Sequence, residues 1–177
     1  MSNTSKNFNS FESALIAVQT GIPVLLWGEP GIGKTYQITQ FANFLNKHLE
    51  VVIASNRDPT DFLGFPKDSA EGTIYSPPKW ALKLSKAGDG ILFLDEVNWG
   101  SRNTQAAMLR VVNEKEVGEC KLPKNTWIIA ASNPPEKSGG SELLAAFSNR
   151  FLHFDVDADL DSWRDWLIGV NRVNSIP

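Results

Sequence analysis

The chain has 177 residues, of which 42% are hydrophobic, so it can bury one sizeable core and has little room for a second domain. Seventeen basic and twenty acidic residues give a net charge of -3, which argues against a global basic surface for nucleic acid or for an anionic membrane. No apolar run approaches the roughly 20 residues of a membrane-spanning helix, and the lone Cys120 excludes an internal disulfide. A cytoplasmic protein without membrane contact is the expectation.

The first half of the chain alternates between helical and extended patterns. Apolar residues at helical spacing predict a helix over 11–20, with Ser10 as its N-cap. A short apolar run over 22–27 predicts a strand buried on both faces of a parallel sheet. Helical spacing returns over 34–49, and a second strand is predicted over 51–55.

Residues 56–80 are rich in Pro, Gly, Asp and Ser and show no clean period, although 72–75 could form part of a short hairpin. The pattern then becomes regular again. It predicts, in chain order, helix 81–87, strand 91–94, helix 104–113, strand 127–131, helix 143–147 and strand 152–156. Five strands alternating with helices predict an α/β fold with a doubly wound parallel sheet and helices on its faces.

A glycine-rich turn joins the first predicted strand to the second predicted helix. Glycines let its backbone curl around a phosphate with the N–H groups pointing inward. Lys34 can reach the β- and γ-phosphates, and Thr35 can ligate Mg²⁺. A glycine-rich turn without a ligand is the alternative. The pattern predicts that ATP is bound by Gly28, Glu29, Pro30, Gly31, Ile32, Gly33, Lys34, Thr35 and Tyr36.

Two carboxylates follow the strand predicted over 91–94. In a parallel sheet this order places Asp95 and Glu96 at the carboxyl edge, where ligands bind. Asp95 suits a magnesium ligand, and Glu96 suits a base that orients and polarises the attacking water. The alternative is a helix N-terminus that favours acidic residues without catalysis.

Two further polar residues could take part in the same chemistry. Asn133 follows the strand predicted over 127–131 and could hold the water in line between the γ-phosphate and Glu96. An Asn-Pro turn explains it equally well. Arg150 lies between a helical and an extended segment, and its guanidinium could stabilise the charge of phosphoryl transfer, whereas a surface arginine is the commoner explanation.

These features in this order resemble the AAA+ ATPases, and the residues of the motifs are most similar to those of the MoxR and dynein-related branch. The similarity runs over about 11–156. The resemblance implies that Asn133 is the sensor of the γ-phosphate and that Arg150 is a finger presented to the ATP of a neighbouring subunit. The matching segments are Gly28-Glu29-Pro30-Gly31-Ile32-Gly33-Lys34-Thr35, Leu94-Asp95-Glu96-Val97-Asn98, Ala131-Ser132-Asn133-Pro134 and Ser148-Asn149-Arg150-Phe151.

The resemblance also carries expectations about architecture. It implies that 1–177 form one P-loop NTPase domain, the AAA+ large subdomain without most or all of the helical lid. Residues 1–10 would then be a disordered or extended lead, and 157–177 the start of a lid or linker. A hairpin inserted within a helix would explain 56–80, and Asn56 could be a switch contact to Glu96. Trp99 departs from the branch, which usually has a basic residue there.

The expected function is ATP hydrolysis by a homo-oligomeric ring, with a hexamer as the expected size, that remodels a protein client or acts on a companion subunit. The main alternative is a binding switch without a lid that loads ATP and turns it over poorly. A DNA-acting protein would need a basic stripe that the sequence lacks. The sequence supports a P-loop kinase least, because Glu96 and an arginine acting in trans favour hydrolysis over transfer of the phosphoryl group to a substrate hydroxyl.

Overall fold

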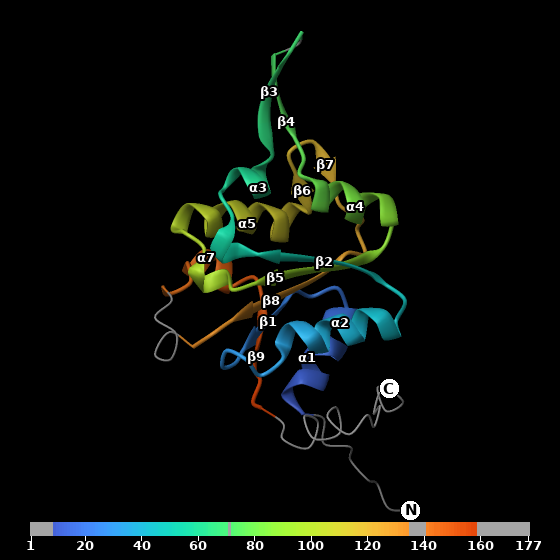
Figure 1. Cartoon of the computed structure of the whole chain (residues 1–177), viewed down its shortest axis with the longest axis vertical. Coiled ribbons are helices and arrows are strands. Elements are labelled where there is room, and N and C mark those ends of the chain that lie inside the picture. Colours follow the sequence, from blue (N-terminus) through green and yellow to red (C-terminus); the bar gives the residue numbers. More distant parts are fainter. Residues whose placement is uncertain (1–8, 71, 135–140, 159–177) are drawn as a thin grey trace, which may run out of the picture.

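Five parallel strands form one sheet in the structure, a computed structural model that describes residues 9–70, 72–134 and 141–158 (Figure 1). The order across the sheet is β2-β5-β8-β1-β9, and every pairing is parallel. The predicted doubly wound α/β sheet is therefore confirmed. The strands are β1 (Val24–Trp27), β2 (His48–Ile53), β5 (Gly90–Asp95), β8 (Trp127–Ser132) and β9 (Leu152–Asp155).

Helices cover both faces of this sheet. In Figure 1, α1 and α2 lie below it, and α3, α4 and α5 lie above it. None of the helices in the described part of the chain is long and apolar enough to cross a membrane. The helices are α1 (Ser10–Gln19), α2 (Lys34–Phe44), α3 (Thr60–Leu63), α4 (Lys79–Ala87), α5 (Arg102–Glu114) and α7 (Ala145–Ser148), with short 3-10 turns η1 (Ala54–Asn56) and η2 (Val97–Trp99).

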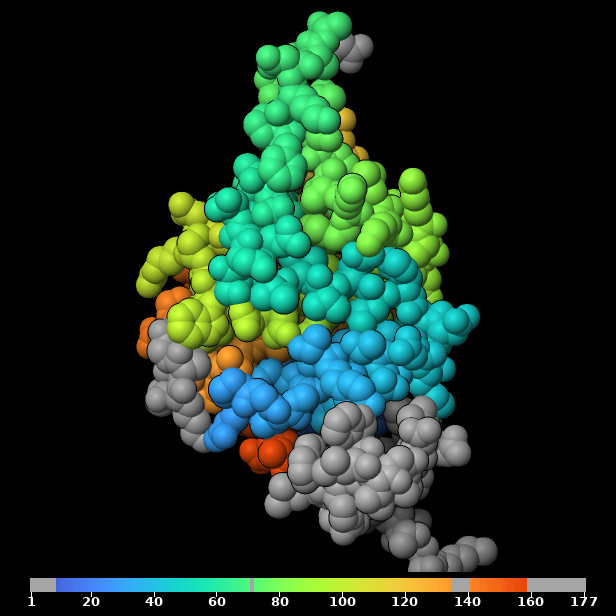
Figure 2. Space-filling view, viewed as in Figure 1, coloured from blue at the N-terminus to red at the C-terminus, as the bar shows by residue number. Residues whose placement is uncertain are grey.

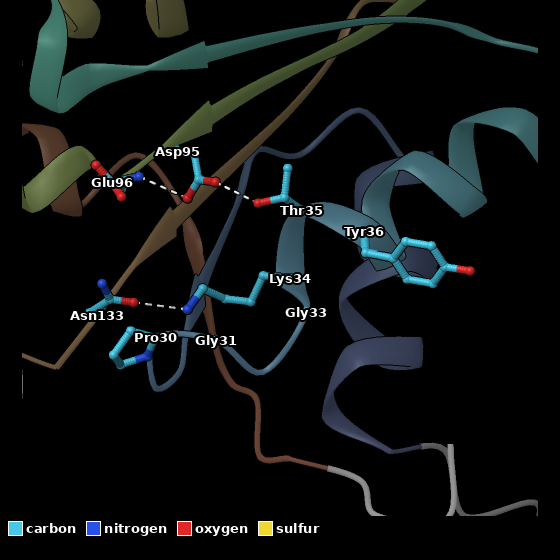
Figure 3. Close-up of a pocket in the computed structure, with 9 residues that line it drawn as sticks. All are labelled: Pro30, Gly31, Gly33, Lys34, Thr35, Tyr36, Asp95, Glu96 and Asn133. Atoms are coloured by element: carbon cyan, nitrogen blue, oxygen red, sulfur yellow. Dashed lines mark hydrogen bonds between the residues drawn. The ribbon is translucent and has the colours of Figure 1, made fainter. Parts of the chain in front are cut away.

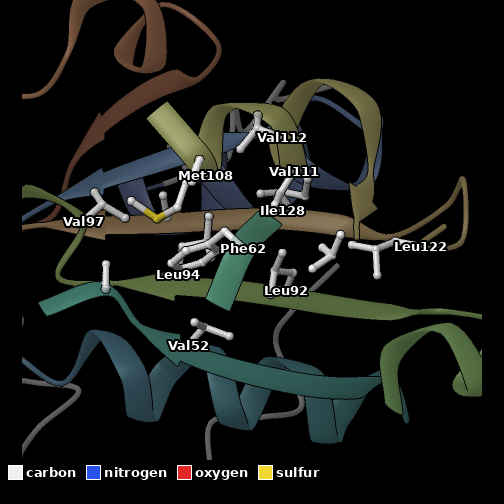
Figure 4. Packing of buried hydrophobic residues seen from close by; sticks show 14 of the residues in the cluster. Val52, Phe62, Leu92, Leu94, Val97, Met108, Val111, Val112, Leu122 and Ile128 are labelled. Atoms are coloured by element: carbon white, nitrogen blue, oxygen red, sulfur yellow. The ribbon is translucent and has the colours of Figure 1, made fainter. Parts of the chain in front are cut away.

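The alternation of side chains along each central strand divides the core into two clusters. Leu92 and Leu94 of β5 point into the cluster beneath α3, α4 and α5, which also contains Phe62 and Met108 (Figure 4). Phe93, between them in sequence, belongs to the cluster on the side of α1 and α2. All five side chains are fully buried, and each contributes about 1.5–3 kcal/mol. This two-sided burial fixes the ends of the strands that carry the polar residues.

Two hairpins extend from the end of α3 and from the end of α5. The longer one, β3 (Phe65–Ser69) with β4 (Gly72–Ser76), stands clear of the body in Figures 1 and 2. It confirms the hairpin expected within residues 56–80. The shorter one, β6 (Glu116–Val117) with β7 (Cys120–Lys121), was not predicted. It packs on the base of the longer hairpin, where the Glu119 N–H donates to the Tyr75 carbonyl at 3.1 Å.

Several predicted boundaries were wrong. Helix α2 ends at Phe44 rather than at residue 49, because Asn46 adopts a left-handed φ of 52° and the chain then enters β2. Strand β2 consequently begins and ends earlier than predicted. Ser10 is the first residue of α1, and its N-cap is Asn9, whose side chain accepts from the Glu12 N–H at 2.8 Å.

These boundaries bear on the two expected terminal segments. The lead expected over 1–10 is therefore too long, because Asn9 and Ser10 belong to the start of α1. The lid or linker expected over 157–177 lies outside the described residues from 159 onward.

Candidate active site

A pocket opens at the carboxyl ends of the three central strands. Because β5, β8 and β1 are adjacent, Asp95, Asn133 and Gly28 are brought together from distant parts of the sequence. Figure 3 shows the phosphate loop, residues 28–35, on one side of the pocket and the end of β5 on the other. The pocket is lined by Pro30, Gly31, Gly33, Lys34, Thr35, Tyr36, Asp95, Glu96 and Asn133.

The backbone of the phosphate loop fits an anion. Gly31 and Gly33 adopt left-handed φ angles of 83° and 88°, which side chains rarely allow. Among the described residues, no atom lies within 4 Å of the position that a Cβ would take at either glycine, so the space beside both glycines is open. Helix α2 begins at the next residue, Lys34, and its positive end faces the same space. The loop therefore has the shape and the polarity that a phosphate group needs.

Lys34 is the central cation of the pocket. Its side chain is buried, and its Nζ donates to the carbonyl oxygens of Gly28 at 2.8 Å and Glu29 at 3.0 Å. A third bond runs from Nζ to the Oδ1 of Asn133 at 2.9 Å. Burial lowers the pKa of Lys34, while the nearby carboxylates of Asp95 and Glu96 raise it and oppose this effect. The ammonium group is thus held between the phosphate loop and the end of β8.

Thr35 and Asp95 form a second contact across the pocket. The Thr35 hydroxyl donates to Asp95 Oδ2 at 2.6 Å, and Asp95 Oδ1 accepts from the Glu96 N–H at 2.9 Å (Figure 3). A hydroxyl and a carboxylate side by side are hard oxygen donors of the kind that Mg²⁺ prefers. The residues present therefore fit a magnesium ion.

Glu96 has an unusual backbone. Its φ of 54° lies in the left-handed region, and it directly follows the end of β5. Its Oε2 accepts a hydrogen bond from the Ser55 hydroxyl at 2.5 Å. The expectation that Asn56 contacts Glu96 is therefore wrong by one residue, because β2 ends at Ile53 and the following turn directs Ser55 to the carboxylate.

The buried side-chain amide of Asn98 supports the backbone of Asn133, the residue expected to sense the γ-phosphate. Asn98 is fully buried, and its Nδ2 donates to the carbonyl oxygen of Asn133 at 3.1 Å. The sequence placed Asn98 in a matching segment but gave it no role. Arg150 lies elsewhere: it is exposed between α7 and β9, and the described residues that line the pocket do not include it.

Comparisons with known proteins give the chain a family. The sequence model of the "ATPase family associated with various cellular activities (AAA)" matches residues 23–153. The fold is similar to a crystal structure of a candidate ATPase from Cytophaga hutchinsonii, with a TM-score of 0.65 and 23% identity over 93% of this chain and 50% of that one.

Curated relatives share the same region. "Structural protein ORF618" of Acidianus two-tailed virus is 28% identical over 174 residues, covering 88% of this chain and 26% of the relative. "Midasin" of Giardia intestinalis is 27% identical over 168 residues, covering 88% of this chain and 3% of that protein. The chain thus spans about a quarter or less of the length of these two relatives. With the family model, the phosphate loop and the sheet order in agreement, the chain belongs to the ATPase family associated with various cellular activities, a family of ATP hydrolases.

Proposed function

We propose that the chain binds MgATP in the pocket at the carboxyl edge of the sheet and hydrolyses it as one subunit of a ring. The observation that carries the proposal is the convergence of Lys34 with Asn133 and of Thr35 with Asp95, through hydrogen bonds of 2.9 and 2.6 Å. These contacts join the phosphate loop to two neighbouring strands, as a site for a phosphate chain and its metal requires.

Each side chain has a role set by its chemistry. Lys34 would exchange its loop carbonyls for phosphate oxygens, and Thr35 and Asp95 would hold the magnesium ion directly or through water. Bound Mg²⁺ supplies charge neutralisation on the phosphates. Glu96 would orient and polarise the attacking water once its carboxylate is released from Ser55. Asn133 would hold the same water in line.

Arg150 would act on the site of a neighbouring copy. Its exposure, and its position away from the residues that line its own pocket, support this assignment. A guanidinium supplied in trans stabilises the charge that develops during phosphoryl transfer. A closed ring of identical subunits, with a hexamer as the expected size, gives every site one such arginine.

A protein is the proposed client or companion. The hairpin formed by β3 and β4 extends from the body, and its side chains Phe65, Ile74 and Tyr75 are exposed. An apolar surface of this kind suits contact with another protein better than contact with an anionic polymer. A cytoplasmic location fits this assignment and is part of the proposal.

The test measures ATP turnover per subunit as Arg150→Ala protein is added to wild type. If Arg150 acts in trans, mixed assemblies contain wild-type sites without an arginine, and turnover per wild-type subunit falls. Unchanged turnover per wild-type subunit would contradict catalysis in trans. Binding of ATP that depends on Lys34, without measurable turnover at any concentration, would instead favour the nucleotide-dependent binding switch.

A further inference from the structure

The short helix α7, which precedes Arg150, cannot hold its position alone. It has four residues, and a helix of that length is unstable without tertiary contacts. Two aromatic anchors flank the arginine: Phe147 is fully buried, Phe151 is nearly so, and their rings lie 4.9 Å apart. These anchors fix the depth of the segment. Its two ends are held by polar contacts with segments that adjoin the nucleotide site of the same subunit: the turn after Glu96 and the end of β1.

Gln105 holds the start of α7. It is fully buried on α5, its Oε1 accepts from the Leu144 N–H at 2.8 Å, and its Nε2 donates to the Gly100 carbonyl at 3.1 Å. Leu144 precedes the first residue of α7, and Gly100 ends the turn that begins after Glu96. One buried amide therefore ties the segment after Glu96 to the helix that leads to Arg150, and both of its hydrogen-bonding ends are used.

His153 holds the other end. Its Nδ1 accepts from the Trp27 indole N–H at 2.9 Å, so the ring proton lies on Nε2, which donates to the Ser148 carbonyl at 2.9 Å. Trp27 is the residue before Gly28, the first glycine of the phosphate loop. Because Nε2 is the donor, His153 cannot take a proton from the nearby Ser148 hydroxyl, and the pair is not a nucleophile with its base.

We propose that Gln105 and His153 are positioning residues that couple the nucleotide site of a subunit to the Arg150 that the same subunit presents to its neighbour. The inference rests on the proposed function. Movement at Glu96 or at the phosphate loop reaches α7 through these two side chains, one at each end. A displacement of about 1 Å of a catalytic group is enough to cost about 100-fold in rate, so a loose α7 would present the arginine poorly.

The experiment mixes two inactive subunits. The donor carries Glu96→Gln, so it has no water-activating carboxylate but keeps Arg150. The acceptor carries Arg150→Ala and keeps its own site. Each alone is expected to be inactive, and the mixture is expected to recover turnover at acceptor sites that face a donor. His153→Phe is then added to the donor only or to the acceptor only. Residue 153 is exposed, so this variant should fold.

The inference predicts an asymmetric result. His153→Phe in the donor should lower the turnover number of the mixture at least about tenfold with the KM for ATP unchanged. In the acceptor, which has no arginine to present, it should change turnover less than about twofold. Gln105→Met should follow the same pattern, with its unfolding midpoint measured first. His48→Phe in the donor is the matched control, because His48 pairs with Glu50 at the opposite end of the sheet.

Three outcomes would overturn the inference in distinguishable ways. Equal losses from both placements would show that His153 only supports the fold. No loss from either placement would show that it does not position α7. No activity in the mixture before His153 is changed would overturn catalysis by Arg150 in trans, and with it the inference.

Discussion

The Nζ of Lys34 and the Oδ1 of Asn133 lie 2.9 Å apart, so a side-chain hydrogen bond joins the phosphate loop to the end of β8. The two residues are 99 positions apart in sequence and meet because β1 and β8 are neighbours in the sheet. A γ-phosphate bound by Lys34 would therefore lie within reach of Asn133. This contact gives the two residues different expected phenotypes.

Lys34→Met should weaken ATP binding, whereas Asn133→Ala should mainly slow turnover. Loss of the ammonium removes charge-assisted hydrogen bonds worth about 1.5–3 kcal/mol, which corresponds to roughly a tenfold to hundredfold loss of affinity. Asn133→Ala should leave affinity within about threefold and lower the turnover number about 100-fold, because it removes one group that orients the water. Calorimetric titration with ATP and steady-state turnover measure the two effects.

The matched control for Lys34 is Lys86→Ala. Lys86 is exposed in the last turn of α4, on the other side of the sheet from α2, and its loss should leave ATP affinity unchanged. Tight ATP binding by Lys34→Met would contradict the placement of the phosphates at the phosphate loop.

Thr35→Ala should raise the concentration of free Mg²⁺ needed for half-maximal turnover. The Thr35 hydroxyl and Asp95 Oδ2 lie 2.6 Å apart and form the proposed oxygen pair for the metal. Removal of the hydroxyl should shift the requirement about tenfold, and Asp95→Asn should shift it further because the formal charge is lost as well. The measurement is turnover against free Mg²⁺ in a buffered titration.

Thr39→Ala provides the control for this shift. Thr39 lies one turn later on α2, and its hydroxyl donates to the Thr35 carbonyl rather than toward Asp95. An equal change in the Mg²⁺ requirement for both threonine variants would argue that α2, and not a metal ligand, had been disturbed.

Glu96→Gly should unfold at higher denaturant than Glu96→Ala, the reverse of the usual order for these residues. Both variants lose the bond to Ser55 and the proposed base, so neither should hydrolyse ATP. Only alanine keeps a Cβ at a φ of 54°, a conformation that costs about 1–2 kcal/mol. Urea unfolding should show a difference of about 1 kcal/mol in favour of glycine. An advantage for alanine would mean that residue 96 leaves the left-handed region in solution.

Much of the fold could be predicted from local patterns. Apolar runs such as 91–94 are buried on both faces, and polar residues directly after them lie at one edge of a parallel sheet, so Asp95 and Asn133 could be placed near the phosphate loop from sequence alone. The segment from Gly28 to Thr35 is continuous in sequence, so its own pattern and its position between a strand and a helix were enough to identify it.

The remaining features depend on contacts between distant segments. Ser55 reaches Glu96 only because β2 ends at Ile53, and His153 meets Trp27 only because β9 pairs with β1. The end of α2 was missed because helical spacing continues past Asn46, and a single left-handed residue has no periodic signal. Gln105 sits on a predicted helix, but nothing in its spacing indicates a buried amide.

Gly118→Ala should loosen the contact between the two hairpins. Gly118 has a φ of 57°, and an added Cβ would lie 2.3 Å from the Tyr75 carbonyl oxygen, a backbone atom that cannot rotate away. Gly88→Ala is the matched control, since its φ is 72° but no atom of the residues that the structure describes lies within 4 Å of the added Cβ. In both variants a residue with a Cβ adopts the left-handed conformation, which costs about 1–2 kcal/mol. Only Gly118→Ala adds overpacking, which costs about 1–3 kcal/mol more.

Two measurements separate this effect from a general loss of stability. Urea unfolding should place Gly118→Ala below Gly88→Ala by at least about 1 kcal/mol if the clash is felt by the whole domain. If the hairpins separate without unfolding the core, hydrogen exchange at the Glu119 amide should accelerate instead, because that amide donates to the Tyr75 carbonyl. Equal stability of the two variants together with unchanged exchange at Glu119 would show that β6 and β7 do not pack on the base of the longer hairpin in solution.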